Sequence, residues 1–163
     1  ADVLNPADLE GDGAELSLFN DTAVTEIYTS IPNRSLGYIW KIKCNETAKV
    51  PAFTNVFPEL NHNEMNGFSH EGGTDALLNG YRFVFLTDPH DHPQNQVRME
   101  VTEELLEARG HEVIRRPLVG DTFFERAFRS LSTADWMTYF LARHYGVDPI
   151  AIPMIEALKR KIS

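Results

Sequence analysis

Apolar residues along this chain recur with two different periods, and each period predicts one type of element. Short runs of aromatic and β-branched residues at Thr25–Ser30 and Tyr81–Asp88 are typical of buried strands. A third run, in residues 111–120, predicts a shorter strand, because Pro117 interrupts it and indicates an edge or an end. Between and after these runs the spacing changes to that of amphipathic helices.

Four segments place apolar residues on one helical face. The predicted faces are, in chain order, Leu36, Ile39, Trp40 and Cys44; Val97, Val101, Leu105 and Ala108; Phe124, Ala127, Phe128 and Leu131; and Ile155, Leu158 and Ile162. Asp121 is placed to cap the third helix, and Pro153 opens the last. Strands that alternate with helices predict an α/β fold, a three-layer α/β/α sandwich around a short parallel sheet.

Composition adds boundaries to this picture. Residues 1–22 are rich in Asp, Glu and Gly, which predicts an acidic lead-in or linker ahead of one domain over residues 23–163. The net charge of −9 disfavours nucleic acid as a partner. A single cysteine, Cys44, excludes an internal disulfide and is typical of a reducing, cytoplasmic setting. We find no long apolar run and no basic leader, so we expect a soluble protein without membrane contact.

The segment Asn45–Glu64 concentrates the candidate chemistry. It contains acids at Glu46, Glu59 and Glu64 and an imidazole at His62. Such groups can supply a general base and a hydrogen-bonding partner, provided that the fold brings them together. The same residue types also serve structural roles, because amide side chains stabilise loops, a helical glutamate pairs with lysine, and a histidine commonly ends a helix. Residue types alone leave both interpretations open.

A second acidic and imidazole cluster consists of Asp88, His90, Asp91 and His92. Carboxylate and imidazole groups this close could hold a divalent ion, but the sequence between prolines is more typical of a solvated turn. No further set of ligands follows at the spacing of helical zinc motifs. We therefore predict no metal site.

Two stretches resemble a known family. Residues 40–64, WKIKCNETAKVPAFTNVFPELNHNE, resemble the C-terminal half of the bifunctional phosphoglucose/phosphomannose isomerase family, in which two sugar-isomerase (SIS) domains stand in tandem. Residues 135–159, DWMTYFLARHYGVDPIAIPMIEALK, resemble that family's terminal segment. The resemblance implies an SIS-like fold and an aldose–ketose isomerase of glycolysis and gluconeogenesis. Such an enzyme interconverts glucose 6-phosphate or mannose 6-phosphate with fructose 6-phosphate and uses no metal or organic cofactor.

The resemblance also implies three catalytic residues. Glu46 matches the glutamate that moves a proton between two carbons through an enediol. His62 matches the histidine associated with ring opening, which reaches its site from a partner subunit and so implies a homodimer. Lys159 matches a lysine that lines the site, although a cation at a helix end also offsets the helix dipole. Where the family tends to carry a hydroxyl or amide residue before this lysine, the chain has Ile152, so we predict that glucose 6-phosphate is the better substrate.

The phosphate-binding elements of the family belong to its first domain. Thr29 and Ser30 occupy the topologically similar turn here, yet IPNRS lacks the hydroxyls and glycines that cradle a phosphate. We therefore expect a separate N-terminal SIS domain as a partner, together with a sugar-phosphate substrate. Two alternatives remain at this point: a non-catalytic SIS module that binds sugar phosphates, and a dimerisation domain with a decayed site.

Overall fold

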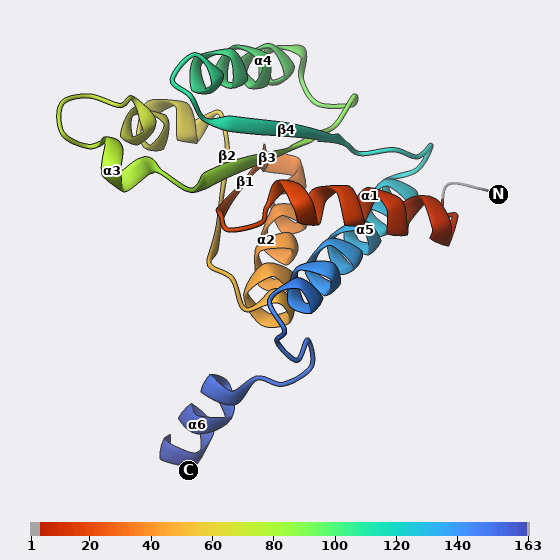
Figure 1. Cartoon of the computed structure of the whole chain (residues 1–163). Helices are drawn as coiled ribbons and strands as arrows, with labels where there is room; N and C mark the ends of the chain where they lie inside the picture. Colours follow the sequence, from red (N-terminus) through yellow and green to blue (C-terminus); the bar gives the residue numbers. More distant parts are fainter. Residues whose placement is uncertain (1–3, 163) are drawn as a thin grey trace.

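The computed structural model describes residues 4–162 and contains a parallel sheet between two layers of helices (Figure 1). The strands are β1 (Val24–Ser30), β2 (Ala52–Phe57), β3 (Tyr81–Thr87) and β4 (Glu112–Pro117), in the order β2-β1-β3-β4. All three neighbouring pairs are parallel. The predicted three-layer α/β/α fold is confirmed.

Helices cover both faces of the sheet. One face packs against α1 (Pro6–Phe19), α2 (Arg34–Lys43) and α5 (Phe123–His144). The other packs against α4 (Pro93–Glu107) and two short helical turns, η3 (Glu59–His62) and η4 (Glu64–Phe68). The remaining elements are η1 (Ile31–Asn33), the turn η2 (Cys44–Ala48), α3 (Asp75–Leu78) and α6 (Pro153–Ile162).

The two apolar clusters follow from side-chain alternation along the central strands. Ile27 and Val84 face α1, α2 and α5, whereas Tyr28, Phe83 and Phe85 face α4. Strands β1 and β3 are buried on both faces, and their aromatic and β-branched residues made them predictable.

Strand β2 is absent from the sequence prediction. It lies at one edge of the sheet, between Pro51 and Pro58, and mixes the polar Thr54 and Asn55 with exposed Phe53. Edge strands tolerate polar residues and flanking prolines, so their pattern resembles a loop. This strand separates the two ends of the segment Asn45–Glu64.

The predicted acidic lead-in is wrong for the part of residues 1–22 that forms α1, while residues 1–3 lie outside the described residues. Helix α1 packs along α5, and Leu16 is completely buried in the main core. Gly13 permits this close approach, because a Cβ atom there would lie 2.3 Å from Cβ of Trp136. Tertiary packing therefore holds a helix whose own sequence carries little helical signal.

The buried face of α4 also differs from the predicted one. Met99 and Leu106 pack on the sheet, whereas Val97, Val101 and Leu105 are exposed. Apolar residues stand on both sides of this helix, so periodicity alone could not select the face that packs on the sheet.

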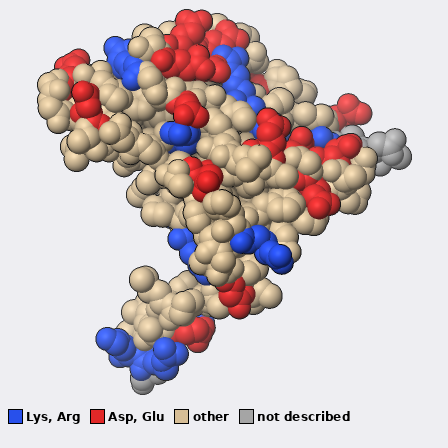
Figure 2. All heavy atoms as spheres, viewed as in Figure 1, with Lys and Arg blue, Asp and Glu red and all other residues tan. Residues whose placement is uncertain are grey.

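Helix α6 lies away from the sheet at the C-terminal end of the described chain (Figure 1). It buries none of its residues, and Met154 and Ile162 are 84% and 75% exposed. Lys and Arg gather at its free end (Figure 2). Within residues 4–162, no helix has the length and apolar character needed to cross a bilayer.

Candidate functional site

Glu46 lies in η2, a single π-helical turn that continues α2. Cys44 and Ala48 in the same turn are buried, which directs the residues between them outward. Lys49 then takes a left-handed conformation (φ 61°) that ends the turn and leads the chain toward β2. Left-handed geometry is uncommon outside glycine, and π-helical turns are frequent at functional sites.

Among the described residues, the Glu46 carboxylate has none of the ion pairs that a structural role would provide. Of the two lysines nearest in sequence, Lys43 pairs with Asp135, and the Lys49 ammonium donates to the backbone carbonyl of Glu46. Among residues 4–162, no cation forms an ion pair with this carboxylate. The side chain is exposed, so it is accessible to a ligand.

Glu46 faces a cavity of about 680 Å³ between η2 and the start of α6. Its lining is Asn45, Glu46, Lys49, Val147, Asp148, Ala151, Ile152, Pro153, Met154 and Ile155. A cavity with a largely apolar wall and a few polar groups is typical of a small-molecule site.

Lys159 lies on the same helix as one wall of this cavity. It follows Ile155 by four residues, so the two positions share a face and are about 6 Å apart along the axis. Its ammonium contacts Glu156 at 3.1 Å. Lys159, Arg160 and Lys161 together form a basic helix end (Figure 2), which locally opposes the acidic field of the protein.

His62 and Glu46 lie at opposite ends of the edge strand β2. Glu46 precedes the amino end of β2, and His62 follows its carboxyl end in η3. A six-residue strand spans roughly 20 Å, so one chain cannot bring both side chains to one small ligand. The imidazole is exposed, and no described residue forms a hydrogen bond with it.

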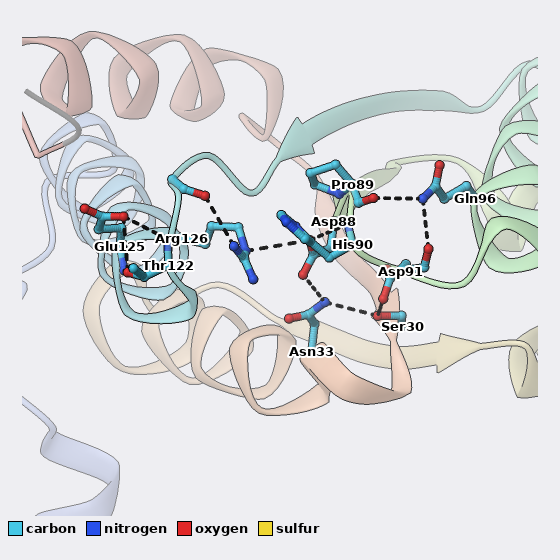
Figure 3. Close-up of polar contacts among 11 residues, drawn as sticks. Ser30, Asn33, Asp88, Pro89, His90, Asp91, Gln96, Thr122, Glu125 and Arg126 are labelled. Carbon is cyan, nitrogen blue, oxygen red and sulfur yellow. Dashed lines mark hydrogen bonds and ion pairs between the residues drawn. The ribbon is translucent and has the colours of Figure 1, made fainter.

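A polar network fills the carboxyl edge of the sheet, where β1 and β3 end (Figure 3). Ser30 donates to Oδ1 of Asp91 at 2.7 Å, and Asn33 donates to Oδ2 of Asp88 at 3.0 Å. The Arg126 guanidinium approaches Asp88 at 3.7 Å. A capping box between Thr122 and Glu125 fixes the start of α5 and hence the position of Arg126.

Open α/β sheets usually bind ligands at this edge, where the strand order reverses. Here two buried carboxylates meet one guanidinium, which makes the edge unsuitable for a phosphate. Burial raises the pKa of Asp88, but hydrogen bonds from the His90 amide and Asn33 outweigh it, so that pKa lies below its usual value. Burial and the nearby Asp88 charge raise the pKa of Asp91.

The sequence predicted no metal site at the cluster of Asp88, His90, Asp91 and His92. The two histidines of this cluster contact neighbouring residues. His90 Nδ1 contacts Asp88 at 3.1 Å, and His92 Nδ1 accepts from the Gln94 amide at the start of α4. Across the described part of the chain, no group of three or more His, Cys, Asp or Glu residues has an arrangement that could hold a metal ion.

Sequence reasoning missed Asn33 and Arg126 in this network, and a buried carboxyl at Glu26. Glu26 is 5% exposed on β1, and burial together with the neighbouring Glu64 raises its pKa from 4.5 to about 8. Asn33 follows the end of a predicted strand, and Arg126 follows the start of a predicted helix. These positions were the only indication in the sequence that the two residues could lie at the carboxyl edge of the sheet. Glu26 is a charged residue within a buried strand, which indicated a special role.

A family model described as the bacterial phospho-glucose isomerase C-terminal SIS domain matches residues 13–162. Proteins named bifunctional phosphoglucose/phosphomannose isomerase are also similar. The one from Thermoplasma acidophilum is 36% identical and covers 84% of this chain and 41% of its own length. Those from Thermoplasma volcanium and Aquifex aeolicus are 34% and 31% identical, and they cover 90% and 81% of this chain and 45% of their own lengths.

The chain therefore spans less than half the length of these relatives. Solved structures share its fold. A glucose-6-phosphate isomerase like protein from Thermus thermophilus has a TM-score of 0.64 at 20% identity and covers 87% of this chain and 46% of its own. The C-terminal domain of glucosamine-fructose-6-phosphate aminotransferase from Francisella tularensis has a TM-score of 0.66 at 14% identity, covering 91% and 43%.

Proposed function

Because the chain belongs to the bacterial phospho-glucose isomerase C-terminal SIS domain family, we propose that it is the proton-transferring half of a sugar-phosphate aldose–ketose isomerase. Its substrates would be glucose 6-phosphate and, less favourably, mannose 6-phosphate, each interconverted with fructose 6-phosphate. The observation that carries the proposal is the Glu46 carboxylate, which has no ion-pairing partner among the described residues and faces a cavity of about 680 Å³.

In the proposed reaction, Glu46 takes the proton from C2 of the open-chain aldose. The electron pair of that C–H bond forms the C1–C2 double bond of the enediol while the carbonyl pair moves onto O1. A proton passes from the C2 hydroxyl to O1, C2 becomes the carbonyl carbon, and Glu46 returns its proton to C1, so no external oxidant or reductant is needed. A positioned carboxylate of this kind typically contributes about 10²–10⁴ in rate. Lys159 would stabilise the negative charge that develops on the enediol oxygens.

His62 would open the sugar ring in the site of a second chain. Roughly 20 Å of strand separates it from Glu46 within one chain, so a site that uses both needs two chains. We therefore propose a homodimer in which each site combines Glu46 of one chain with His62 of its partner.

Phosphate binding is assigned to a first SIS domain. The acidic carboxyl edge of this sheet disfavours phosphate, and the relatives are about twice as long as the chain. The apolar face of α6, with Met154 and Leu158 exposed, would pack against that domain and enclose the cavity. Buried, unpaired Cys44 suits a reducing, cytoplasmic setting.

The test is an isomerase assay of the chain alone and of the chain fused to the part of the Thermoplasma acidophilum relative that it does not cover. We expect the fusion to convert glucose 6-phosphate to fructose 6-phosphate. Glu46→Gln in the fusion should lower kcat/KM by about 10²–10⁴. Glu107→Gln, on the exposed end of α4, is the matched control and should keep full activity.

Mixing two inactive variants tests the shared site. A fusion with Glu46→Gln and one with His62→Ala each lack one group at every site, but a mixed dimer regains one complete site. Random pairing should restore about a quarter of the original activity. No recovery would mean that each site is built from one chain. A fusion that binds hexose phosphate without turnover would instead identify a binding module.

A further inference from the structure

The segment that carries His62 is held by a hydrogen-bonded group of three residues outside the proposed catalytic set. Glu64, two residues after His62, accepts from the Tyr28 hydroxyl at 2.6 Å through Oε1. Its second oxygen accepts from the Asn55 side-chain amide, also at 2.6 Å. Short bonds to an ionised carboxylate are among the stronger hydrogen bonds in proteins.

The sheet fixes the geometry of this group. Tyr28 on β1 and Asn55 on β2 are direct partners in the parallel pairing, so their side chains leave the same face of the sheet. Tyr28 is fully buried among Phe57, Phe83 and Phe85, which restricts its ring to one position. Glu64 therefore docks onto two donors that the strands hold at a fixed spacing.

A second tether lies on the other side of His62. Asn61 donates to the Thr102 hydroxyl on α4 at 2.8 Å, and Leu60 is completely buried below it. His62 thus stands between two fixed points, and its exposed imidazole is the part of η3 that projects outward. The backbone on both sides of His62 is held in this way, so it loses little freedom when the imidazole meets a ligand.

The placement of Glu64 is unfavourable as mere packing. Its carboxylate faces the buried carboxyl of Glu26, and the two groups repel each other when both are ionised. Apolar residues of similar volume usually fill such a position at least as well. Costly buried polar groups are concentrated where a protein must hold a functional group in place.

We propose that Tyr28, Asn55 and Glu64 are positioning residues, which fix the η3–η4 segment so that His62 presents its imidazole to the sugar ring in the partner's site. This inference rests on the proposed isomerase function. Displacement of a catalytic group by about 1 Å can lower a rate by about 10²-fold, so loss of one anchoring bond should be visible in kcat.

The experiment uses the two-domain fusion with Tyr28→Phe or Glu64→Gln. Each should lower kcat for glucose 6-phosphate by about tenfold with little change in KM, because binding of the phosphate is unaffected. In a His62→Ala background neither substitution should lower kcat further, because both act through that imidazole. Tyr145→Phe is the matched control, since its hydroxyl accepts a 2.6 Å bond from the Thr22 amide far from η3.

Hydrogen exchange provides a readout that does not depend on activity. Amides in residues 59–68 should exchange faster in Tyr28→Phe and Glu64→Gln than in the unsubstituted fusion. Their exchange rates should be unchanged in Tyr145→Phe. An equal fall in kcat with and without His62, or unchanged exchange and unchanged kcat, would overturn the positioning role. An active fusion in which His62→Ala has no effect would remove the role of His62 and this inference together, while isomerase function would stand.

Discussion

Replacement of Glu26 by glutamine should change how stability depends on pH. Glutamine has the shape of the protonated acid but carries no ionisable group. The pKa of Glu26 is about 8 in the folded protein, against 4.5 ordinarily, because the side chain is buried and lies near Glu64. The folded state therefore binds this proton more tightly, so the contribution of Glu26 is most favourable below pH 4.5 and decreases as the pH rises toward 8.

The size of this effect follows from linkage. Each pKa unit corresponds to about 1.4 kcal/mol. Between pH 5 and pH 7 Glu26 is ionised in the unfolded chain but largely protonated in the folded one, which should remove about 2–3 kcal/mol of unfolding free energy. The Glu26→Gln variant should lack this decrease. All other titrating groups are shared, so the difference between the two pH profiles isolates Glu26.

Urea unfolding followed by tryptophan fluorescence at pH 5, 6 and 7 measures both profiles. Glu10→Gln, on the exposed side of α1, is the control and should reproduce the original profile to within about 0.5 kcal/mol. If the original chain and Glu26→Gln gave parallel profiles, Glu26 would be ionised in the folded state at pH 7, and the reasoning would be wrong.

Three further predictions concern other parts of the molecule. Gly13→Ala should lower the free energy of unfolding by about 1–3 kcal/mol, because its Cβ would meet Trp136. Gly11→Ala is the control: a Cβ there has no atom within 4 Å, so it should raise the free energy of unfolding by up to about 1 kcal/mol in the same denaturation assay. Thr122→Ala removes the cap of α5 and should cost about 1 kcal/mol in thermal unfolding; an unchanged melting temperature would contradict this. Ile152→Thr in the two-domain fusion should raise the rate with mannose 6-phosphate relative to glucose 6-phosphate, and an unchanged ratio would remove this residue from substrate choice.

The sequence was sufficient for the elements that bury apolar residues on both faces or on one clear face. Strands β1 and β3 and helix α2 were predictable because their apolar residues agree with the local period. Helix α1 was not, because one of its buried positions is Gly13, which a hydrophobic pattern cannot register. Its helical state depends on packing against α5, and the contact residue Trp136 lies far along the chain from Gly13.

Helix α5 shows a related limit. The predicted face contained Phe124 and Phe128, which are 69% and 57% exposed, whereas Ala134 and Met137 are fully buried. Small residues at the contact let α1 and α5 approach closely, so side-chain size was a poor guide to burial here.

For the candidate site, residue types and the family resemblance selected Glu46, His62 and Lys159, but their spatial relation required the fold. If β2 is overlooked, the segment from Glu46 to His62 resembles one compact loop. Because the segment contains β2, Glu46 and His62 lie at opposite ends of that strand. The roles of the three residues stay predictions. The polar network at the carboxyl edge was hidden because Asn33 and Arg126 are distant in sequence from Asp88.

The separate position of α6 has a consequence for proteolysis of the protein. The helix buries none of its residues, so a single cut in the connecting residues 147–152 would leave the sheet and its two apolar clusters intact. Such a clipped chain would still melt cooperatively at its usual temperature while lacking Lys159. With Lys159 in its proposed role, a measurement of folding and a measurement of turnover would then disagree, because the sheet determines the first and α6 contributes to the second.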